Sequence, residues 1–257
     1  MHVILTSTAL KLQHPSRRAI TEKWIDRLAD VRGISKSALY VGLERGCEED
    51  AEIYERVISF MPVVFVPNSG NGPHSNNISV WQQAFDHGSK FFTFLENDVM
   101  AGPDLFEYME WMRAKFKDDK GIFCINSYTG NEDSNRRYSY WRKPSLGVWG
   151  FGMWKDRAAE CLKDYKDTGL DKIAQIGWDV HLNTVSNRRR AAIMPCYSRC
   201  INIGVEGIHS YVGNPELDET KRTWSGNDNE MLEECLQYYE IPPIDKREYI
   251  MGWNDAK

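Results

Sequence analysis

One short apolar run that ends in acids constrains this chain more than any other feature. Residues 91–95 read Phe-Phe-Thr-Phe-Leu, and Glu96, Asn97 and Asp98 follow at once. Aromatic and β-branched residues in so short a run predict a strand that is buried on both faces. The acids then lie at the carboxyl end of that strand, where ligands bind in open α/β sheets. The run therefore predicts a site for a hard cation, whose shell is completed by water and substrate phosphates.

The alternative for Asp98 is a structural one, because an acid after a strand often caps the next helix. Here Pro103 and Asp104 already supply the start of that helix. This leaves Asp98 for another role.

The composition allows one large hydrophobic core and argues against some classes of function. The chain has 257 residues, 42% of them hydrophobic, and a formal net charge of -5. That charge argues against a wholly basic nucleic-acid-binding surface, although local basic patches remain possible. The six cysteines form no Cys-x-x-Cys pair, so we expect free thiols in a reducing cytoplasm. We also expect a soluble protein, because the sequence has no basic n-region and no apolar run of about 18 residues.

Strands and helices alternate in the pattern of a parallel sheet. Strands are predicted at 2–6, 38–43, 63–66, 122–125 and 191–194, with helices over 50–60, 81–87 and 103–116. The polar stretch 69–77 is predicted to be a flexible loop, either on the surface or over a ligand. Segment 146–154 combines three glycines with aromatics, which indicates backbone pressed against a bulky group or a tight β segment packed on its own sheet.

Three further residues are candidates for chemistry. Arg17 and Arg18 are predicted to lie on a loop after the first strand, where they could hold a phosphate or be only solvated. Asp179 follows Trp178 at a predicted helix start, as either an N-cap or a catalytic base.

These segments, in this order, resemble the GT-A glycosyltransferases and, among them, the N-acetylglucosaminyltransferase I family. Residues 95–99 and 101–108 are similar to that family's Glu-Asp-Asp signature and the helix after it, and this is the most specific match. Shorter matches occur at 124–127, 150–153, 178–179 and 204–210, so the resemblance spans roughly residues 1–210.

The resemblance implies a fold and a donor. The fold is a single GT-A (Rossmann-like) α/β domain with a mostly parallel central sheet flanked by helices. Residues 1–100 would form the nucleotide-sugar-binding half, 101–213 the acceptor and catalytic half, and 214–257 a C-terminal extension. The donor would be a nucleotide-sugar, a UDP-sugar in particular, held through Mn²⁺ or Mg²⁺. The metal residues would be Asp98 and His209, and the donor-binding residues Arg17, Arg18, Glu44, Glu96, Asn97, Gly150 and Gly152.

Two residues depart from the family pattern. Asn97 replaces the middle acid of Glu-Asp-Asp, and Val180 replaces the second acid of Trp-Asp-Asp. In a direct displacement, which inverts the anomeric centre, a carboxylate opposite the leaving group takes the acceptor's proton. Asp179 is the expected base, with Glu206 or Glu96 as the alternatives.

The acceptor is not fixed by the sequence. Trp141 lies among basic residues that could stack bases and contact phosphates, namely Arg136, Arg137, Arg142 and the run 188–190. One candidate acceptor is therefore a hydroxymethylated base in viral DNA, modified by a phage-encoded enzyme in the host cytoplasm. A protein or glycan acceptor is equally compatible with these residues.

Two other functions compete with the transferase. One is a glycoside hydrolase with paired carboxylates, which the basic N-terminal loop and the order of the motifs disfavour. The other is a non-catalytic nucleotide or nucleic-acid binding protein on a degenerate transferase scaffold, with Asn97 and Val180 as marks of lost chemistry. The sequence does not predict the oligomeric state.

Overall fold

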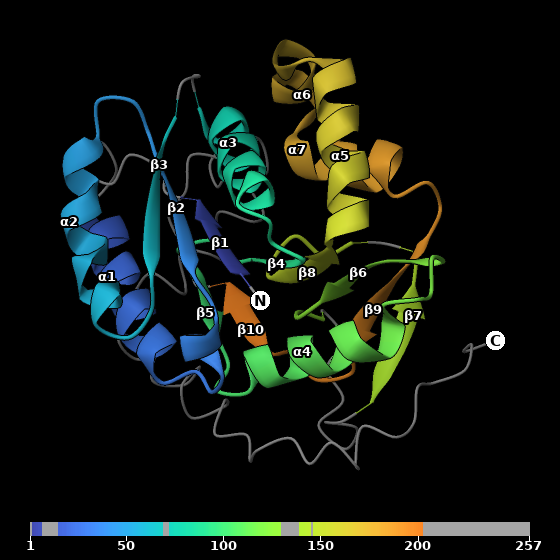
Figure 1. The fold of residues 1–257 in the computed structure, drawn as a ribbon, viewed down its shortest axis with the longest axis horizontal. Coiled ribbons are helices and arrows are strands. Elements are labelled where there is room, and N and C mark those ends of the chain that lie inside the picture. The colour runs from blue at the N-terminus through green and yellow to red at the C-terminus, as the bar shows by residue number, and fades with distance from the viewer. Residues whose placement is uncertain (1, 7–14, 69–71, 130–138, 145, 203–257) are drawn as a thin grey trace, which may run out of the picture.

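The computed structural model describes residues 2–6, 15–68, 72–129, 139–144 and 146–202 (Figure 1). An eight-stranded sheet crosses it in the order β3-β2-β1-β4-β8-β6-β9-β7. Its strands are β1 (His2–Thr6), β2 (Leu39–Leu43), β3 (Val63–Pro67), β4 (Phe91–Phe94), β6 (Ile122–Asn126), β7 (Tyr140–Lys143), β8 (Phe151–Trp154) and β9 (Ala191–Pro195). Strands β1 to β4 pair in parallel, as do β6 and β9, whereas β7 and β8 run the opposite way.

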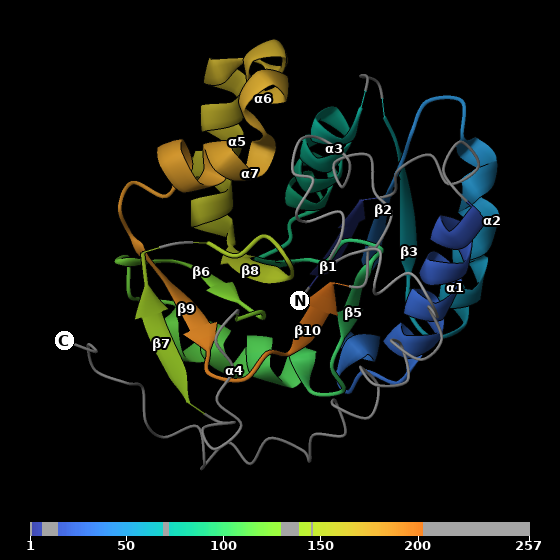
Figure 2. The ribbon, with the colours of Figure 1, turned by 180° about the vertical axis from the view of Figure 1, so that it is seen from behind.

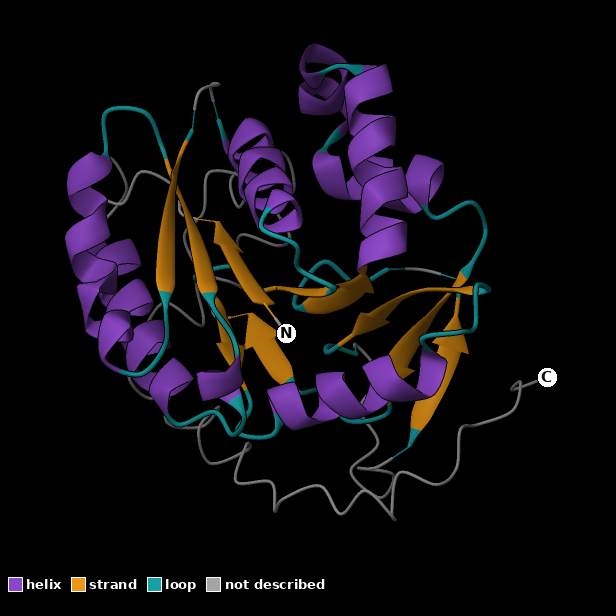
Figure 3. Ribbon diagram, in the orientation of Figure 1, coloured by secondary structure: helices purple, strands orange, loops and turns teal. Residues whose placement is uncertain are grey.

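Helices cover both faces of the sheet (Figures 1 and 3). One face packs against α1 (Pro15–Ala29), α2 (Ala51–Tyr54) and α4 (Leu105–Phe116), and the other against α3 (Pro73–Asp86), α5 (Lys155–Thr168), α6 (Leu170–Ile176) and α7 (Trp178–His181). Short 3-10 helices occupy Ile34–Lys36, Glu48–Asp50 and Glu55–Ser59, and a π-helical turn occupies Leu182–Ser186.

Alternating side chains of the strands divide the core in two. Phe91 packs in the cluster under α1 and α4, whereas Phe92 and Phe94 pack in the cluster under α3 and α5. This is the two-residue period of a strand whose faces are both covered. The mixed α/β architecture, with a central sheet flanked by helices, confirms the predicted fold class.

Most of the predicted site residues lie at one edge of the sheet. The parallel strands β1, β2, β3 and β4 end there, and Phe151, the first residue of β8, pairs with Phe94 and with Asn126 at the end of β6. We call this edge the carboxyl edge. A separate antiparallel ribbon of β5 (Val99–Ala101) and β10 (Cys200–Asn202) follows, with the two strands side by side in Figure 2.

Three predicted elements differ from the structure. The predicted loop 69–77 contains the start of α3, because Pro73 occupies its first turn, a position that proline favours. Arg17 and Arg18 lie in the first turn of α1 rather than on a loop. Residues 50–60 do not form one helix but alternate between 3-10 and α-helical turns.

Two expectations from composition concern membranes and thiols. Within the part of the chain that the structure describes, no helix has both the length and the apolar character that a membrane span requires. The described cysteines are buried free thiols, namely Cys47, Cys124, Cys161, Cys196 and Cys200.

Gly152 offers a test of how tightly β8 packs. A Cβ atom added there would lie 2.5 Å from Phe91 Cζ and 2.9 Å from Met109 Sδ. Because overpacking a core costs about 1–3 kcal/mol, we expect Gly152→Ala to lower the free energy of unfolding by that amount in urea denaturation. Gly121→Ala is the control, since Gly121 is exposed and its nearest neighbour is the Asp119 side chain at 3.1 Å. Equal unfolding free energies for the two variants would contradict this packing.

Candidate functional site

A tight turn at the end of β4 holds the predicted acids. Val99 N donates to Glu96 O at 3.0 Å, so that Asn97 and Asp98 form the centre of the turn. Glu96 and Asp98 are half-buried, whereas Asn97 is buried. The Asn97 amide donates to Thr21 Oγ1 of α1 at 2.9 Å. The amide that stands in place of an acid thus fixes the turn to the helix beneath it, rather than facing a ligand.

The β5–β10 ribbon brings a second segment to this turn. Asn202 pairs with Val99, the residue after Asp98. His209 and Glu206 lie outside the described residues, as do residues 214–257.

A buried ion pair joins the β5–β10 ribbon to the start of α4. Arg199 Nη1 lies 3.3 Å from an Asp104 carboxylate oxygen, and both side chains are fully buried. Asp104 sits at the predicted start of α4, but its side chain makes no capping hydrogen bond. Burial raises the pKa of Asp104, and the charges of Arg199 and Arg32 act against that rise. Removal of either partner would leave a buried charge, so the pair fixes the ribbon to α4.

A hydrogen-bonded cluster joins the ends of β2 and β3 to α3. Asn68 Nδ2 donates to Glu44 Oε2 at 3.2 Å, and Ser75 Oγ donates to Asn68 Oδ1 at 3.2 Å. Asn76 Nδ2 donates to Gly42 O at 3.3 Å. Within the described residues, the other carboxylate oxygen, Glu44 Oε1, is buried and has no hydrogen-bond partner.

The environment of Glu44 favours a ligand that donates a hydrogen bond. Burial raises the pKa of Glu44, while hydrogen bonds from Asn68, Asn76 and Gly72 lower it. A fixed carboxyl group with one unused oxygen can accept a hydrogen bond from an N–H or O–H group of a bound molecule. A buried oxygen that accepts no hydrogen bond is unfavourable.

The two predicted donor-binding glycines have different surroundings. Gly150 has φ of 68° at the carboxyl edge, and a Cβ there would overlap Ser127 Oγ and lie 3.5 Å from Leu95 Cδ1. Only glycine fits that position. The space beside Gly152 is filled by Phe91 and Met109. Core packing therefore explains Gly152 without a ligand.

Asp179 lies on a helix that packs against the end of β4. The Trp178 ring lies 5.0 Å from the Phe94 ring and 6.2 Å from the Phe151 ring, measured between centroids. Gly177 occupies the N-cap position of α7, so the capping alternative for Asp179 is wrong. The half-buried Asp179 side chain is thus on an element that adjoins the carboxyl edge.

The predicted phosphate-binding arginines have modest support. Arg18 is exposed, and its guanidinium lies 3.3 Å from Glu22, one turn along α1. Exposed pairs of this kind contribute little to stability, so Arg18 remains available to a ligand.

The arginine run predicted to contact DNA lies at the opposite edge of the sheet. It precedes Ala191, which pairs with Ile122 at the start of β6. A strand of four or five residues, at about 3.3 Å per residue, places it roughly 13–16 Å from the carboxyl edge. Arg142, on β7, pairs with Ile193 of β9, and Arg136 and Arg137 lie outside the described residues.

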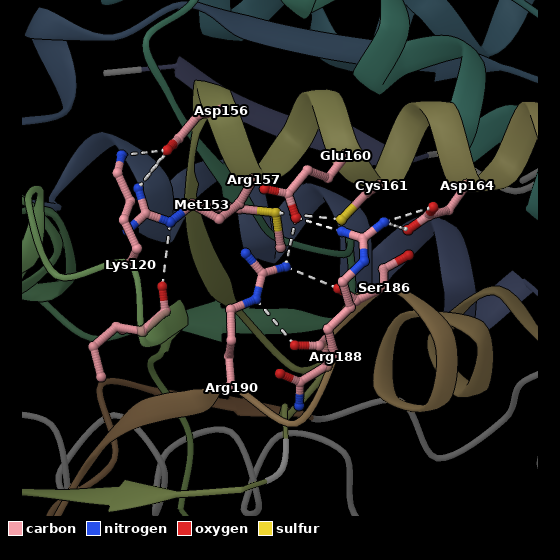
Figure 4. Close-up of polar contacts among 12 residues, drawn as sticks. Lys120, Met153, Asp156, Arg157, Glu160, Cys161, Asp164, Ser186, Arg188 and Arg190 are labelled. Atoms are coloured by element: carbon pink, nitrogen blue, oxygen red, sulfur yellow. Dashed lines mark hydrogen bonds and ion pairs between the residues drawn. The ribbon is translucent and has the colours of Figure 1, made fainter.

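Three of these arginines, Arg142, Arg188 and Arg190, bind acids, and Figure 4 shows the contacts of Arg188 and Arg190. Arg188 binds Glu160 and makes two hydrogen bonds to Asp164, at 2.9 and 3.0 Å. Arg190 donates to Glu160 Oε2 at 2.8 Å. In the same way, Arg142 donates to Asp119 at 2.6 Å. A nucleic-acid backbone would have to displace these carboxylates.

The fit to a metal ion is partial within the described residues. They contain no group of three or more His, Cys, Asp or Glu side chains placed to hold one. Glu96 and Asp98 nevertheless supply two carboxylates in one turn, and Mg²⁺ is often held by one or two carboxylates together with water and substrate phosphates. The turn therefore suits an ion that binds with a phosphorylated donor.

Several residues of the site were missed by sequence reasoning. Ser75 and Asn76 fall in the predicted loop 69–77, although a proline after Gly72 is a helix-start signal that could have revealed them. Asn68, which follows β3, was not singled out. The Asp104–Arg199 pair joins residues 95 apart in the sequence and gave no local signal.

Comparison with known proteins shows the fold. No family model and no curated protein matches the chain. The structure of S. aureus TarS residues 1–349 with UDP-GlcNAc matches with a TM-score of 0.52 and 11% identity, covering 86% of this chain and 65% of that one. A cytidylyltransferase from Leptospira borgpetersenii matches with a TM-score of 0.50 and 10% identity, covering 95% and 98%.

The matching TarS structures are longer than this chain. This chain spans 60, 65 and 59% of the length of the three matching TarS 1–349 structures. At such low identity the likeness is one of fold alone, a sheet flanked by helices as in TarS and the cytidylyltransferase. The narrower resemblance to N-acetylglucosaminyltransferase I stays a prediction.

Proposed function

We propose that this chain is a glycosyltransferase that uses a nucleotide-sugar, in particular a UDP-sugar. The observation that supports this most is that Glu44, the turn 96–98 and the start of α7 all adjoin the carboxyl edge of one sheet. Ligands of open α/β sheets bind at that edge. The fold is shared with TarS, which has been solved with UDP-GlcNAc.

The donor would lie along the carboxyl edge from β2 to β4. Glu44 would accept the imide N–H of the uracil ring through its unused oxygen. Asp98, with Glu96 nearby and His209 as a further proposed ligand, would hold Mn²⁺ or Mg²⁺. Such an ion would neutralise the charge of the departing diphosphate.

The reaction is a single displacement with Asp179 as the base. Asp179 takes the proton of the acceptor hydroxyl as the acceptor oxygen bonds to the anomeric carbon. The bond from that carbon to the diphosphate oxygen breaks, and the diphosphate leaves from the opposite face. The configuration of the anomeric carbon is therefore inverted.

A second candidate is nucleotidyl transfer to a sugar phosphate. The Leptospira cytidylyltransferase is matched along 98% of its length, whereas TarS is matched only in part. Pyrophosphate release from CTP or UTP in the presence of hexose phosphates would identify this activity. UDP release from a UDP-sugar would identify the glycosyltransferase.

Nucleotide binding tests the proposed donor site directly. We expect calorimetry with Mn²⁺ to show tighter binding of UDP than of CDP, ADP or GDP, and Glu44→Gln to weaken UDP binding about tenfold. The glutamine side chain of this variant has only one acceptor oxygen, and the ligand and Asn68 Nδ2 would compete for it. Glu52→Gln, an exposed carboxyl group on α2, is the control. Equal binding of all four nucleotides, or unchanged UDP binding by Glu44→Gln, would remove Glu44 from the donor site.

Thermal unfolding of Glu44→Gln and the wild type at several pH values shows whether the variant remains folded. Burial raises the pKa of Glu44 above its value in the unfolded chain. The stability linked to its protonated form is present at low pH and is lost as the pH rises through the folded-state pKa. Glu44→Gln should therefore gain thermal stability relative to the wild type at neutral pH. That gain should vanish below about pH 4, where the glutamate is protonated in both states.

A further inference from the structure

Trp149 is the most exposed aromatic side chain among the described residues, with 38% of its surface open to solvent. Other described tryptophans, such as Trp24 and Trp81, are almost fully buried. The Tyr128 ring stands edge-on to Trp149, with 4.9 Å between centroids and 67° between planes. An exposed indole that packs against a second ring presents a fixed, flat apolar face on which a ligand can stack.

The backbone that carries Trp149 is held at both ends. On one side, Cys200 Sγ donates to Trp149 O at 3.2 Å, and Ser127 N donates to Gly150 O at 2.8 Å. On the other side, the Asn183 side chain makes two hydrogen bonds to the backbone of Leu146, at 2.8 and 3.3 Å. A ring on such a fixed segment is preorganised, so that binding loses little conformational entropy.

The same contacts place this segment between the two proposed reacting groups. Gly150 adjoins Leu95, which precedes the acidic turn by one residue. At the other end, Asn183 Nδ2 also donates to Asp179 O at 3.3 Å. Trp149 therefore lies on the part of the carboxyl edge that connects the diphosphate end of the site to the base.

We propose that Trp149, supported by Tyr128, is the acceptor platform, and that it stacks against a pyranose ring of an uncharged glycan acceptor. This rests on the proposed function for its place in the reaction. The indole face carries a negative quadrupole, and the axial C–H groups of a pyranose present a weakly positive, apolar face to it. Stacking at Trp149 would hold an acceptor hydroxyl near Asp179.

Charge favours a glycan over DNA for this position. A duplex needs lysines or arginines that neutralise its phosphates, whereas the described arginines 142, 188 and 190 bind carboxylates near the opposite edge of the sheet. The whole chain has a formal net charge of -5. A neutral sugar requires no such cations.

Saturation-transfer NMR on the full chain tests the platform without relying on turnover. The probes are methyl glycosides of glucose, galactose and N-acetylglucosamine, together with cellobiose and chitobiose. At least one should bind the wild type, and Trp149→Ala should weaken that binding about tenfold, the scale expected when a stacking ring is truncated. Trp149→Phe should retain most of the affinity. Ile58→Ala, a change at another exposed apolar residue, should bind as the wild type does.

Parallel measurements separate the platform from the proposed function. If UDP binds but none of the glycosides does, or if Trp149→Ala binds them as tightly as the wild type, the platform is overturned. It is also overturned if duplex DNA binds through Trp149 and glycosides do not. If glycoside binding depends on Trp149 while neither UDP binding nor UDP-sugar turnover is found, the platform holds and the proposed function fails.

Discussion

Asp98→Ala is expected to abolish metal-dependent sugar transfer while the protein stays folded. The turn that contains Asp98 is fixed by the Val99–Glu96 backbone bond and by the Asn97–Thr21 hydrogen bond, and neither uses the Asp98 side chain. Asp98 also lies at a strand exit and is not part of the hydrophobic core, so we expect the variant to stay folded. Its carboxylate, by contrast, is the proposed ligand of the ion that neutralises the leaving diphosphate, and that term is worth several kcal/mol in the transition state.

The measurement is a Mn²⁺ titration of UDP binding and of UDP release, with thermal unfolding recorded in parallel. The wild type should show metal-dependent binding and turnover, and Asp98→Ala should show neither. Asp118→Ala is the matched control, because the Asp118 side chain is 91% exposed and lies 3.9 Å from the ammonium group of the neighbouring Lys117. Undiminished turnover by Asp98→Ala would exclude Asp98 from the metal site and remove the main support for the proposed function.

The sequence predicted those elements whose signals are local. The continuous apolar run 91–95 predicted a strand buried on both faces, and the spacing of Leu105, Met109, Met112 and Phe116 predicted α4. Each signal reflects the immediate surroundings of one element. The acids that follow the run are therefore placed correctly at a strand exit.

Non-local pairing is what the sequence could not supply. Strand β8 inserts in antiparallel orientation between β4 and β6. That insertion decides that Trp149 and Gly150 adjoin the acidic turn. The pairing of β9 with β6 likewise places the run 188–190 at the far edge. The sequence grouped Trp141 and Arg142 with this run, and the pairing of β7 with β9 does place them on neighbouring strands.

Asp179→Asn is expected to slow the reaction without weakening the donor complex. The asparagine keeps the shape of the side chain but cannot take the proton of the acceptor hydroxyl. Loss of a general base typically lowers the rate by about 10²–10⁴-fold. The affinity for UDP and Mn²⁺ should be unchanged, because those groups bind at Glu44 and the turn 96–98 in the proposed arrangement. Binding and rate should therefore separate.

The test compares kcat for sugar transfer with the dissociation constant of UDP, once an acceptor has been found among the glycosides that bind at Trp149. Asp171→Asn, an exposed acid in the first turn of the neighbouring helix α6, is the matched control and should change neither quantity. A loss of UDP affinity in Asp179→Asn would show instead that Asp179 maintains the local structure, and a loss of affinity for the UDP-sugar alone would show that it holds the sugar. Capping of α7 would not be that structural role, because Gly177 occupies the N-cap position. With either outcome, Glu206 or Glu96 would become the base to test next.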